Sequence, residues 1–530
     1  MIKDMTAGSP IKLIMTFAVP VLIGNIFQQL YNISDILIVG RLLGVEALAA
    51  VGVSAPIFMV LLMIAFGFTG GLTVITAQRF GAKDVSGVRA SVVHSLIAST
   101  ILSLAMTGLT LFYLPQILHL MNVPENIWDN AYRFLFVLCS GLVLVVSYNL
   151  LSGFIRALGD SKTPLYFLIF STVLNALLNL VLVYFTGLGV VGSALGTLTA
   201  MTISVVLCVI YIGRKFPILR LRRTDWVYNP AFMREHLYVA VPMALQFSVI
   251  ALGLIIIQTV CNSFGSDTIA AFTSALRIEQ LATSPLVALG FALATYTAQN
   301  FGAGKIGRIR RGVVRSSLVS VLFSISVALL VRFVGEDMIG VFIKGEKPEI
   351  IDIAKGYLDI STLFYVFLGQ IFIFRNTLQG MGQSVIPMAA SIVELVMRSF
   401  AAVYLASRMG YEGIYFASPI AWVGAAAVVS FGYLKMVRWF RHCLFCRKKH
   451  FRSEDADLRS EAETVPAEYN PGLNIFIDKK AGQSYKIFRN VADLAQLVEL
   501  LICNQWVGGS SPSVGTIKKS LPSRRLFLWY

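Results

Sequence analysis

The sequence predicts an all-α membrane protein in which about twelve transmembrane helices form two pseudosymmetric six-helix bundles. Three observations predict this fold class: an apolar composition, a series of apolar stretches of membrane-spanning length, and an internal repeat. The 530 residues are 56% hydrophobic and only 14% charged, which is more apolar than soluble domains usually are. A water-soluble fold is therefore excluded.

The apolar stretches follow one another up to about residue 438, and each is long enough for one crossing of about 20 residues. They begin near residues 13, 46, 88, 131, 163, 190, 236, 268, 312, 356, 386 and 412. The first stretch is not a cleavable signal peptide, because Gln28, Gln29 and Asp35 follow it in place of a small-residue cleavage site.

The net charge of +16 reports topology, because the basic residues gather in alternate loops. The basic side holds, among others, Lys3, Lys12, Arg79, Lys83, Arg89, Arg156, Lys162, Arg214, Lys215, Arg220, Arg222, Arg223, Lys305, Arg308, Arg310, Arg311, Arg375, Lys435 and Arg438. The opposite loops hold acids such as Glu125, Asp129, Glu336, Asp337, Glu346 and Glu349. The positive-inside rule places both termini in the cytoplasm. No nucleic-acid partner is expected.

An internal repeat with an offset of about 220 residues sets the architecture. Ala18-Val19-Pro20 recurs as Ala240-Val241-Pro242, Gly44 as Gly265, Ala77 to Ala82 as Ala298 to Ala303, Gly159 to Pro164 as Gly382 to Pro387, and Gly189 to Gly192 as Gly410 to Gly413. Since an even number of spans separates the copies, we expect two bundles of the same topology around a central cavity, as in many transporters.

The repeat divides the chain into four predicted parts. They are an N-terminal bundle over residues 1–212, a basic cytoplasmic linker over 213–235, a C-terminal bundle over 236–438 and a cytoplasmic tail over 439–530. The linker is expected to be a solvated connection.

The order of these motifs resembles the multidrug and toxic compound extrusion (MATE) family over roughly residues 8 to 440. The resemblance depends on Pro20, the segment Tyr31 to Asp35 with the later Gly40 and Gly44, the Ala-Gln-x-Phe-Gly-Ala motif, and the Gly-Asp/Gln-Ser-x-x-Pro turn. It implies an antiporter that exports amphipathic, often cationic drugs or metabolites, driven by a proton or sodium gradient through alternating access.

An ionisable side chain within a membrane span indicates function by default, and Asp35 is such a residue. Gln28 lies two turns before it on the same face, Asn175 and Asn179 are one turn apart, and Thr197 follows in the next span. The resemblance matches these positions to a cation site in the N-terminal bundle, although some members carry an acid where this chain has Asn179. The alternatives are a hydrogen-bond network around Asp35 and asparagines that join helices.

Pro20 removes one backbone hydrogen bond from its helix. The family associates this proline with helix bending that reports the charge of Asp35, and the alternative is a static kink.

Glu394 and Arg398 are four residues apart and can pair on one helical face. They form a possible second polar site, as a gate or coupling group, or else a structural pair. Glu279, near Arg277, is a weaker candidate of the same kind.

No cofactor, catalytic residue or metal site is expected. Cys139, Cys208 and Cys261 fall within apolar spans, and the single Cys443/Cys446 pair lacks the second pair of ligands that a zinc site needs.

The tail contains a segment, residues 492–516, that resembles a translated transfer RNA gene. The codons for Ala492-Asp493 and for Val514-Gly515 can be reverse complements of each other. The codons for Leu501 to Gln505 can form a hairpin whose loop holds a threonine anticodon, and the codons for Gly509 to Pro512 fit a T arm. The alternative is a coincidence of codon degeneracy. The encoded CCA end favours a prokaryote, and thus the inner membrane of a bacterial or archaeal cell.

Two other functions compete with drug export. A strongly basic cavity would favour a flippase for a lipid-linked precursor, but few cations besides Arg398 fall within the predicted spans. A polytopic membrane enzyme would need a cluster of histidines or paired acids, and the chain has only five histidines. The expected partners are a small-molecule substrate and the lipid bilayer, and the expected oligomeric state is a monomer.

Overall fold

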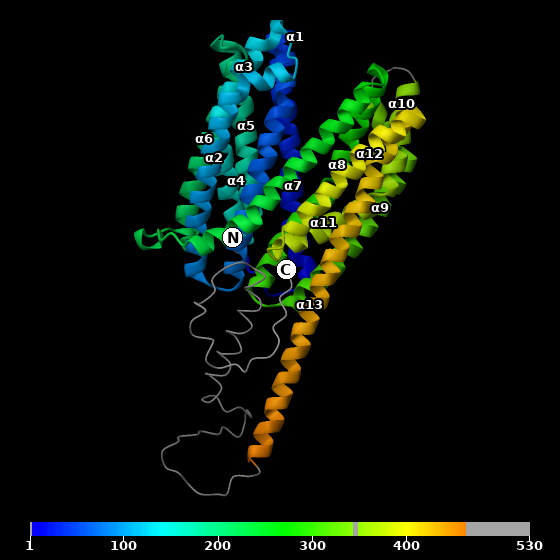
Figure 1. Cartoon of the computed structure of the whole chain (residues 1–530). Coiled ribbons are helices and arrows are strands. Elements are labelled where there is room, and N and C mark those ends of the chain that lie inside the picture. Colours follow the sequence, from blue (N-terminus) through cyan, green and yellow to red (C-terminus); the bar gives the residue numbers. More distant parts are fainter. Residues whose placement is uncertain (1–2, 343–347, 463–530) are drawn as a thin grey trace. The chain divides into compact units, whose positions relative to one another are not determined.

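The computed structural model describes residues 3–342 and 348–462, and these residues form helices joined by short connections (Figure 1). The first half contains α1 (Pro10–Gly81), α2 (Val85–Leu120), α3 (Glu125–Ser140), α4 (Leu142–Ala157), α5 (Lys162–Phe185) and α6 (Gly189–Lys215). The short 3-10 helices η1 (Pro217–Leu219) and η2 (Arg223–Asp225) follow. The second half contains α7 (Pro230–Asn262), α8 (Ser266–Gly302), α9 (Ile306–Phe342), α10 (Pro348–Leu363), α11 (Tyr365–Gly380), α12 (Val385–Met409), η3 (Gly410–Phe416) and α13 (Ala417–Ala462).

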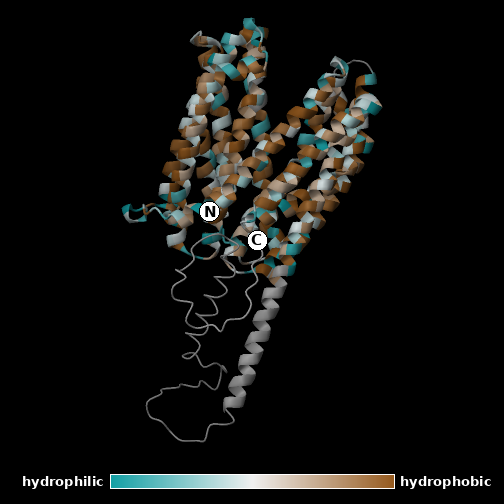
Figure 2. Cartoon of the chain, viewed as in Figure 1, coloured by the Kyte–Doolittle hydropathy of each residue, from teal (hydrophilic) through white to brown (hydrophobic). Residues whose placement is uncertain are grey.

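Within the described residues, nine apolar stretches are long enough to cross a membrane, and two bent helix pairs bring the number to eleven. One of the nine, Val385–Arg438, contains two helices, α12 and the first part of α13, on either side of η3. Counting these separately gives the twelve spans that the sequence predicts. Hydrophobic residues cover most of the length of the helices (Figure 2), as a lipid-facing surface requires.

The first two predicted spans both lie in α1, which consists of two helices that meet at a kink at Gly44. The chain turns back at this kink, because Met5, just before α1, and Gly81, at its end, both lie beside Gln299. Gly44 has φ of 83° and is the one residue inside α1 with non-helical dihedral angles. Its repeat partner Gly265 has φ of 93° and separates α7 from α8. Glycine adopts this left-handed region at little energetic cost. Gly44 and Gly265 therefore recur in the repeat because both positions need a positive φ.

Two other predicted spans, one in each half, are bent rather than straight. The pair α3 and α4 bends by 44° at Gly141, and the pair α10 and α11 bends by 51° at Phe364. Since the bends recur at the same place in both halves, they belong to the repeated architecture.

The last helix extends beyond the last predicted span. The predicted cytoplasmic tail begins at residue 439, and α13 continues through its first part to Ala462. No proline or glycine occurs between Arg438 and Ala462, so no residue in this stretch breaks the helix. The side chains of residues 441–462 and all residues from 463 onward, including the transfer-RNA-like segment, lie outside the described structure.

Of the described residues, 3–228, 236–342 and 348–437 form one compact unit that contains both halves. Each half has its own buried apolar cluster: one surrounds Leu114, Leu118 and Leu135, and the other surrounds Tyr357, Tyr365 and Trp422. The exact bounds of the two bundles stay predictions.

The repeated Ala-Gln-x-Phe-Gly-Ala motif forms the contact between the halves. Gln78 donates a hydrogen bond from Nε2 to the carbonyl of Gly380 (2.9 Å), and Gln299 donates from Nε2 to the carbonyl of Ala157 (2.8 Å). Gly81 and Gly302 let the two backbones cross here. A Cβ on Gly81 would lie 1.9 Å from the carbonyl oxygen of Gln299, and a Cβ on Gly302 would lie 1.9 Å from that of Gln78. A residue with a side chain does not fit at this crossing.

The N-terminal segment that precedes α1 joins the same contact. The amide of Met5 donates to Oε1 of Gln299 (2.8 Å), and the carbonyl of Met5 accepts from Asn300 and Arg308. Lys3 donates its amide to the carbonyl of Leu158 at the end of α4. The chain therefore ties both halves together at the end of the helices that carries the basic loops.

Candidate functional site

The first group of polar side chains lies between α1, α5 and α6. Asn179 of α5 donates from Nδ2 to Oδ1 of Asp35 in α1, at 2.5 Å. Asn179 is fully buried, and Asp35 is half-buried. The structure thus brings together two predicted site residues that are 144 positions apart in the sequence.

The neighbouring pair extends this group by one helical turn. Asn175 donates from Nδ2 to Oγ1 of Thr197 in α6, at 3.0 Å. Tyr31, one turn before Asp35 on α1, interacts with both Asp35 and Thr197. The hydrogen bonds therefore link three helices of the first half around a single carboxylate.

Two oxygen atoms in this group have no hydrogen-bond partner among the described residues. They are Oδ1 of Asn175 and Oδ1 of Asn179, and both are buried. Oδ1 of Asn179 packs against Gly196, where a Cβ would lie only 2.1 Å from it. The carboxylate of Asp35 and these two amide oxygens are the kind of oxygen ligands that a hard cation such as sodium prefers. The carboxylate alone could instead bind a proton.

Gln28 and Pro20 lie on α1 but outside the hydrogen bonds described above. The side chain of Gln28 is exposed, and Pro20 is buried. The dihedral angles around Pro20 are helical, since the non-helical residue inside α1 is Gly44. The predicted roles of Gln28 as a ligand and of Pro20 in bending stay predictions.

The second group of polar side chains lies in the other half and is centred on Glu394 of α12. Its Oε1 accepts from Arg398 (2.6 Å), and its Oε2 accepts from Arg375 of α11 (3.0 Å). The three side chains are 6 to 8% exposed, and Nε of each arginine has no partner among the described residues. The sequence places Arg375 in a basic cytoplasmic loop, which is wrong: the residue is buried in α11, where Glu394 compensates its charge.

Glu279 of α8 lies near this cluster. Its Oε2 accepts from the hydroxyl of Tyr357 (2.8 Å), and the charge of Arg398 interacts with its carboxylate. The hydrogen-bond partner of Glu279 lies on another helix, α10, whereas the neighbouring Arg277 is exposed. Successive residues on a helix point in different directions, and the direction of Glu279 is toward α10 and α12.

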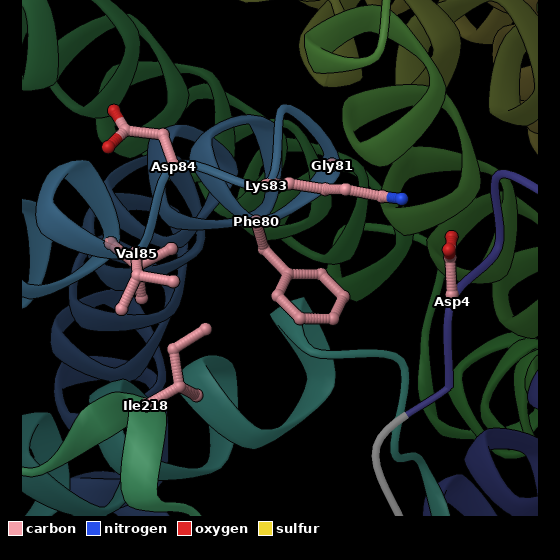
Figure 3. A pocket seen from close by; sticks show the side chains of 8 residues that line it. Asp4, Phe80, Gly81, Lys83, Asp84, Val85 and Ile218 are labelled. Atoms are coloured by element: carbon pink, nitrogen blue, oxygen red, sulfur yellow. The ribbon is translucent and has the colours of Figure 1, made fainter.

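A small cavity of about 240 Å³ lies near the start of the chain and is shown in Figure 3. It is lined by Asp4, Phe80, Gly81, Lys83, Asp84, Val85, Val88 and Ile218. Asp4 accepts from the amide of Thr6, and Asp84 accepts from the amide of Gly87 at the start of α2. These carboxylates hold the local backbone, so the cavity is not the candidate site.

No group of three or more histidine, cysteine or acidic side chains that could hold a metal occurs among the described residues. Cys139, Cys208 and Cys261 are buried and free.

Several contributing residues were missed by sequence reasoning. The sequence gives Tyr31 no role beyond its motif, predicts a loop at Arg375, and identifies Gln78 and Gln299 only as repeated residues. The available signal for the glutamines was their recurrence at the same motif position in both halves, each at the end of an apolar span.

The model of the MatE family matches the chain twice, over residues 20–181 and 242–404. Each match covers most of one half, and together they span well over half of the sequence.

Two curated relatives and one solved structure illustrate the similarity. The chain is 27% identical to the "Probable multidrug resistance protein YpnP" of Bacillus subtilis, over 84% of this chain and 99% of that protein. It is 24% identical to the "Multidrug export protein MepA" of Staphylococcus saprophyticus, over 71% of this chain and 83% of that protein. A structure of a MOP superfamily transporter from Pyrococcus furiosus superposes with a TM-score of 0.76 at 24% identity, covering 82% of this chain and 97% of the other. The predicted fold class is confirmed.

Proposed function

This chain belongs to the MatE family, and from that premise we propose that it is a cation-coupled antiporter that exports amphipathic, often cationic drugs or metabolites. The family is one of membrane transporters and not of enzymes. The names of the relatives, a multidrug resistance protein and a multidrug export protein, support drugs as the substrate class. The coupling ion is a proton or sodium.

The hydrogen bond between Asp35 and Asn179 is the observation that carries the coupling proposal. A charged carboxylate within a membrane span is energetically costly, so an acidic residue there indicates a functional role. Here it lies on α1 and meets an amide of α5, while the Asn175–Thr197 pair connects α5 to α6. A proton or a sodium ion at Asp35 changes the attraction between α1 and its two neighbours.

Coupling requires that the ion binds one conformation more tightly than the other, because an ion that binds both equally shifts no population. Asp35 meets this requirement if its surroundings change when the halves move. The hydrogen bonds of Gln78 and Gln299 tie the halves at one end of the helices. In alternating access these bonds break in one state and form in the other.

The charge distribution supports a multi-pass protein of a bacterial or archaeal inner membrane with both termini in the cytoplasm. The residues tied at the contact between the halves include Lys305 and Arg308, which are among the basic residues assigned to that side.

Purified protein in proteoliposomes tests this function directly. Uptake of a fluorescent organic cation is measured under an imposed proton gradient, an imposed sodium gradient, both, or neither. We expect uphill transport under at least one gradient and none without a gradient. Equal transport rates with and without either gradient would contradict cation coupling.

Asp35→Asn identifies the coupling residue, because it keeps the size and the hydrogen-bonding capacity of the side chain but removes its charge. We expect normal insertion and loss of gradient-driven export. Asp352→Asn is the matched control, since Asp352 is an exposed acid at the start of α10 in the other half. Wild-type uphill transport by purified Asp35→Asn would show that Asp35 is structural.

A further inference from the structure

Residues 214–228 make up most of the predicted 213–235 linker and are called the linker from here on. They carry an unusual combination of exposed side chains. Trp226, Val227 and Tyr228 are 55%, 66% and 58% exposed. The exposed basic residues of this linker are Arg214, Lys215, Arg220, Arg222 and Arg223. A solvated loop has no need of a tryptophan and a tyrosine on its surface, whereas these two residues are typical of the membrane–water interface.

The linker is held in place at several points. Phe216 and Leu219 are 1% and 5% exposed, so they anchor the linker to the protein. Arg220 donates to the carbonyls of Gly213 and Arg214 and so caps the end of α6. A fixed backbone presents the remaining side chains in a constant arrangement, which lowers the entropic cost of binding a ligand.

The charge of the linker is strongly positive. Its acid, Asp225, is engaged by the backbone amide of Arg222. Arg222 and Arg223 flank it with exposed guanidinium groups, which are well suited to bind phosphate. The surface therefore combines phosphate-binding cations with apolar and amphipathic side chains.

The linker also lies where lipid headgroups would be. It extends sideways from the ends of α6 and α7, across the direction of the helices, as Figure 1 shows. A segment that leaves the bundle sideways at the end of its membrane-spanning helices runs along the surface of the bilayer.

We propose that the linker is a binding surface for anionic phospholipid in the leaflet that it faces. Arg222 and Arg223 bind the phosphates of the headgroups, and Trp226 and Val227 insert among the adjoining glycerol and upper acyl groups. Tyr228 limits the depth of insertion, because its ring stacks on His94 of α2 with 5.8 Å between ring centroids. This inference concerns lipid binding and does not depend on the transport proposal.

Tryptophan quenching in vesicles of one fixed composition tests the proposal. The vesicles contain equal amounts of phosphatidylcholine and phosphatidylglycerol, and bromine, a quencher, is placed on the upper acyl chain of one lipid or of the other. The chain has six tryptophans, so the contribution of Trp226 is the difference between wild type and Trp226→Phe. We expect this contribution to be quenched at least about twofold more by brominated phosphatidylglycerol, given the attraction of each basic residue to anionic lipid.

Two charge variants provide the comparison. Arg222→Gln with Arg223→Gln is expected to make the quenching by the two brominated lipids equal. Arg310→Gln with Arg311→Gln is the matched control, because these are also two adjacent, exposed arginines predicted on the same side of the membrane, and it should keep the preference. Size-exclusion profiles establish that the variants are folded.

Three results would overturn the proposal. Absence of quenching of Trp226 by either lipid would make the linker a solvated connection. Equal quenching in the wild type would leave only apolar contact without headgroup selectivity. Loss of the preference in the Arg310/Arg311 control as well would assign it to overall charge rather than to this surface.

Discussion

Gln78 and Gln299 occupy equivalent positions of the repeat, and each donates a hydrogen bond to a backbone carbonyl of the opposite half. Their acceptors, Gly380 at the end of α11 and Ala157 at the end of α4, are themselves on equivalent helices. The pseudosymmetry that relates the two halves therefore also relates one hydrogen bond to the other. The contact is made of two copies of one motif, so any separation of the halves at this end would break both hydrogen bonds.

A side chain at this crossing is expected to force the halves apart. In Gly302→Ala the new Cβ would lie 1.9 Å from the carbonyl oxygen of Gln78, and overpacking of this kind costs about 1–3 kcal/mol. We expect a lower unfolding temperature of the purified protein and loss of export in vesicles. Gly307→Ala is the control, since no atom lies within 4 Å of its Cβ position; equal behaviour of the two variants would contradict the role of the crossing.

Glu394 is expected to matter more for stability than either arginine that it binds. Glu394→Gln removes the carboxylate that binds both buried guanidinium groups and leaves Arg398 only the nearby Glu279, whereas Arg398→Gln leaves Glu394 paired with Arg375. Breaking a buried pair by removing one partner costs about 3–5 kcal/mol. Thermal unfolding of Glu394→Gln, Arg398→Gln, Arg375→Gln and the Glu394/Arg398 double variant measures this. The losses should be non-additive, and additive losses of equal size would argue against a shared cluster.

Asp84 is expected to give stability that depends on pH. Burial alone would raise the pKa of its carboxyl, but hydrogen bonds from Gly87 and Ser86 and the charge of Arg79 lower it below its usual value. A lowered pKa means that the stabilisation is present at neutral pH and is lost as the pH falls through the folded-state pKa. Asp84→Ala should therefore cost about 1 kcal/mol near pH 7, as for other helix caps, and less near pH 3.

Asp84→Asn separates the cap from the charge. Asparagine keeps the acceptor for the amide of Gly87, so this variant should stay close to wild type at neutral pH and lose most of the pH dependence. An Asp84→Ala deficit that is the same at both pH values would exclude an electrostatic contribution.

The segment after Ala462 is expected to be dispensable, because it lies beyond the repeat and part of it resembles a transfer RNA gene. A chain truncated after Ala462 should insert and export as the full chain does, and immunoblotting and vesicle transport measure the two properties. Normal expression with lost export would overturn this expectation. Sequencing of the gene provides a second test, since the DNA for residues 492–516 should fold as a cloverleaf.

Contacts between residues of one helix can be predicted from the sequence. Glu394 and Arg398 are four residues apart, and the helical repeat alone places them together. The hydrogen bond between Asn179 and Asp35 was only suggested, through the family resemblance. The sequence predicts Arg375 in a loop, but it is buried against Glu394. A positive charge near the end of an apolar stretch is found both in loop residues and in buried residues whose partner lies on another helix, so the sequence does not separate the two cases.

The sequence by itself determined the number of spans, their order and the twofold repeat, because the thickness of the bilayer sets the length of each apolar stretch and the repeat is visible in the residues themselves. Only the tertiary structure decided which polar side chains meet across helices: Asp35 with Asn179, Glu394 with Arg375, and Gln78 and Gln299 with the opposite half. The physical reason is that the rotation and tilt of each helix are set by packing against its neighbours, which no single segment encodes.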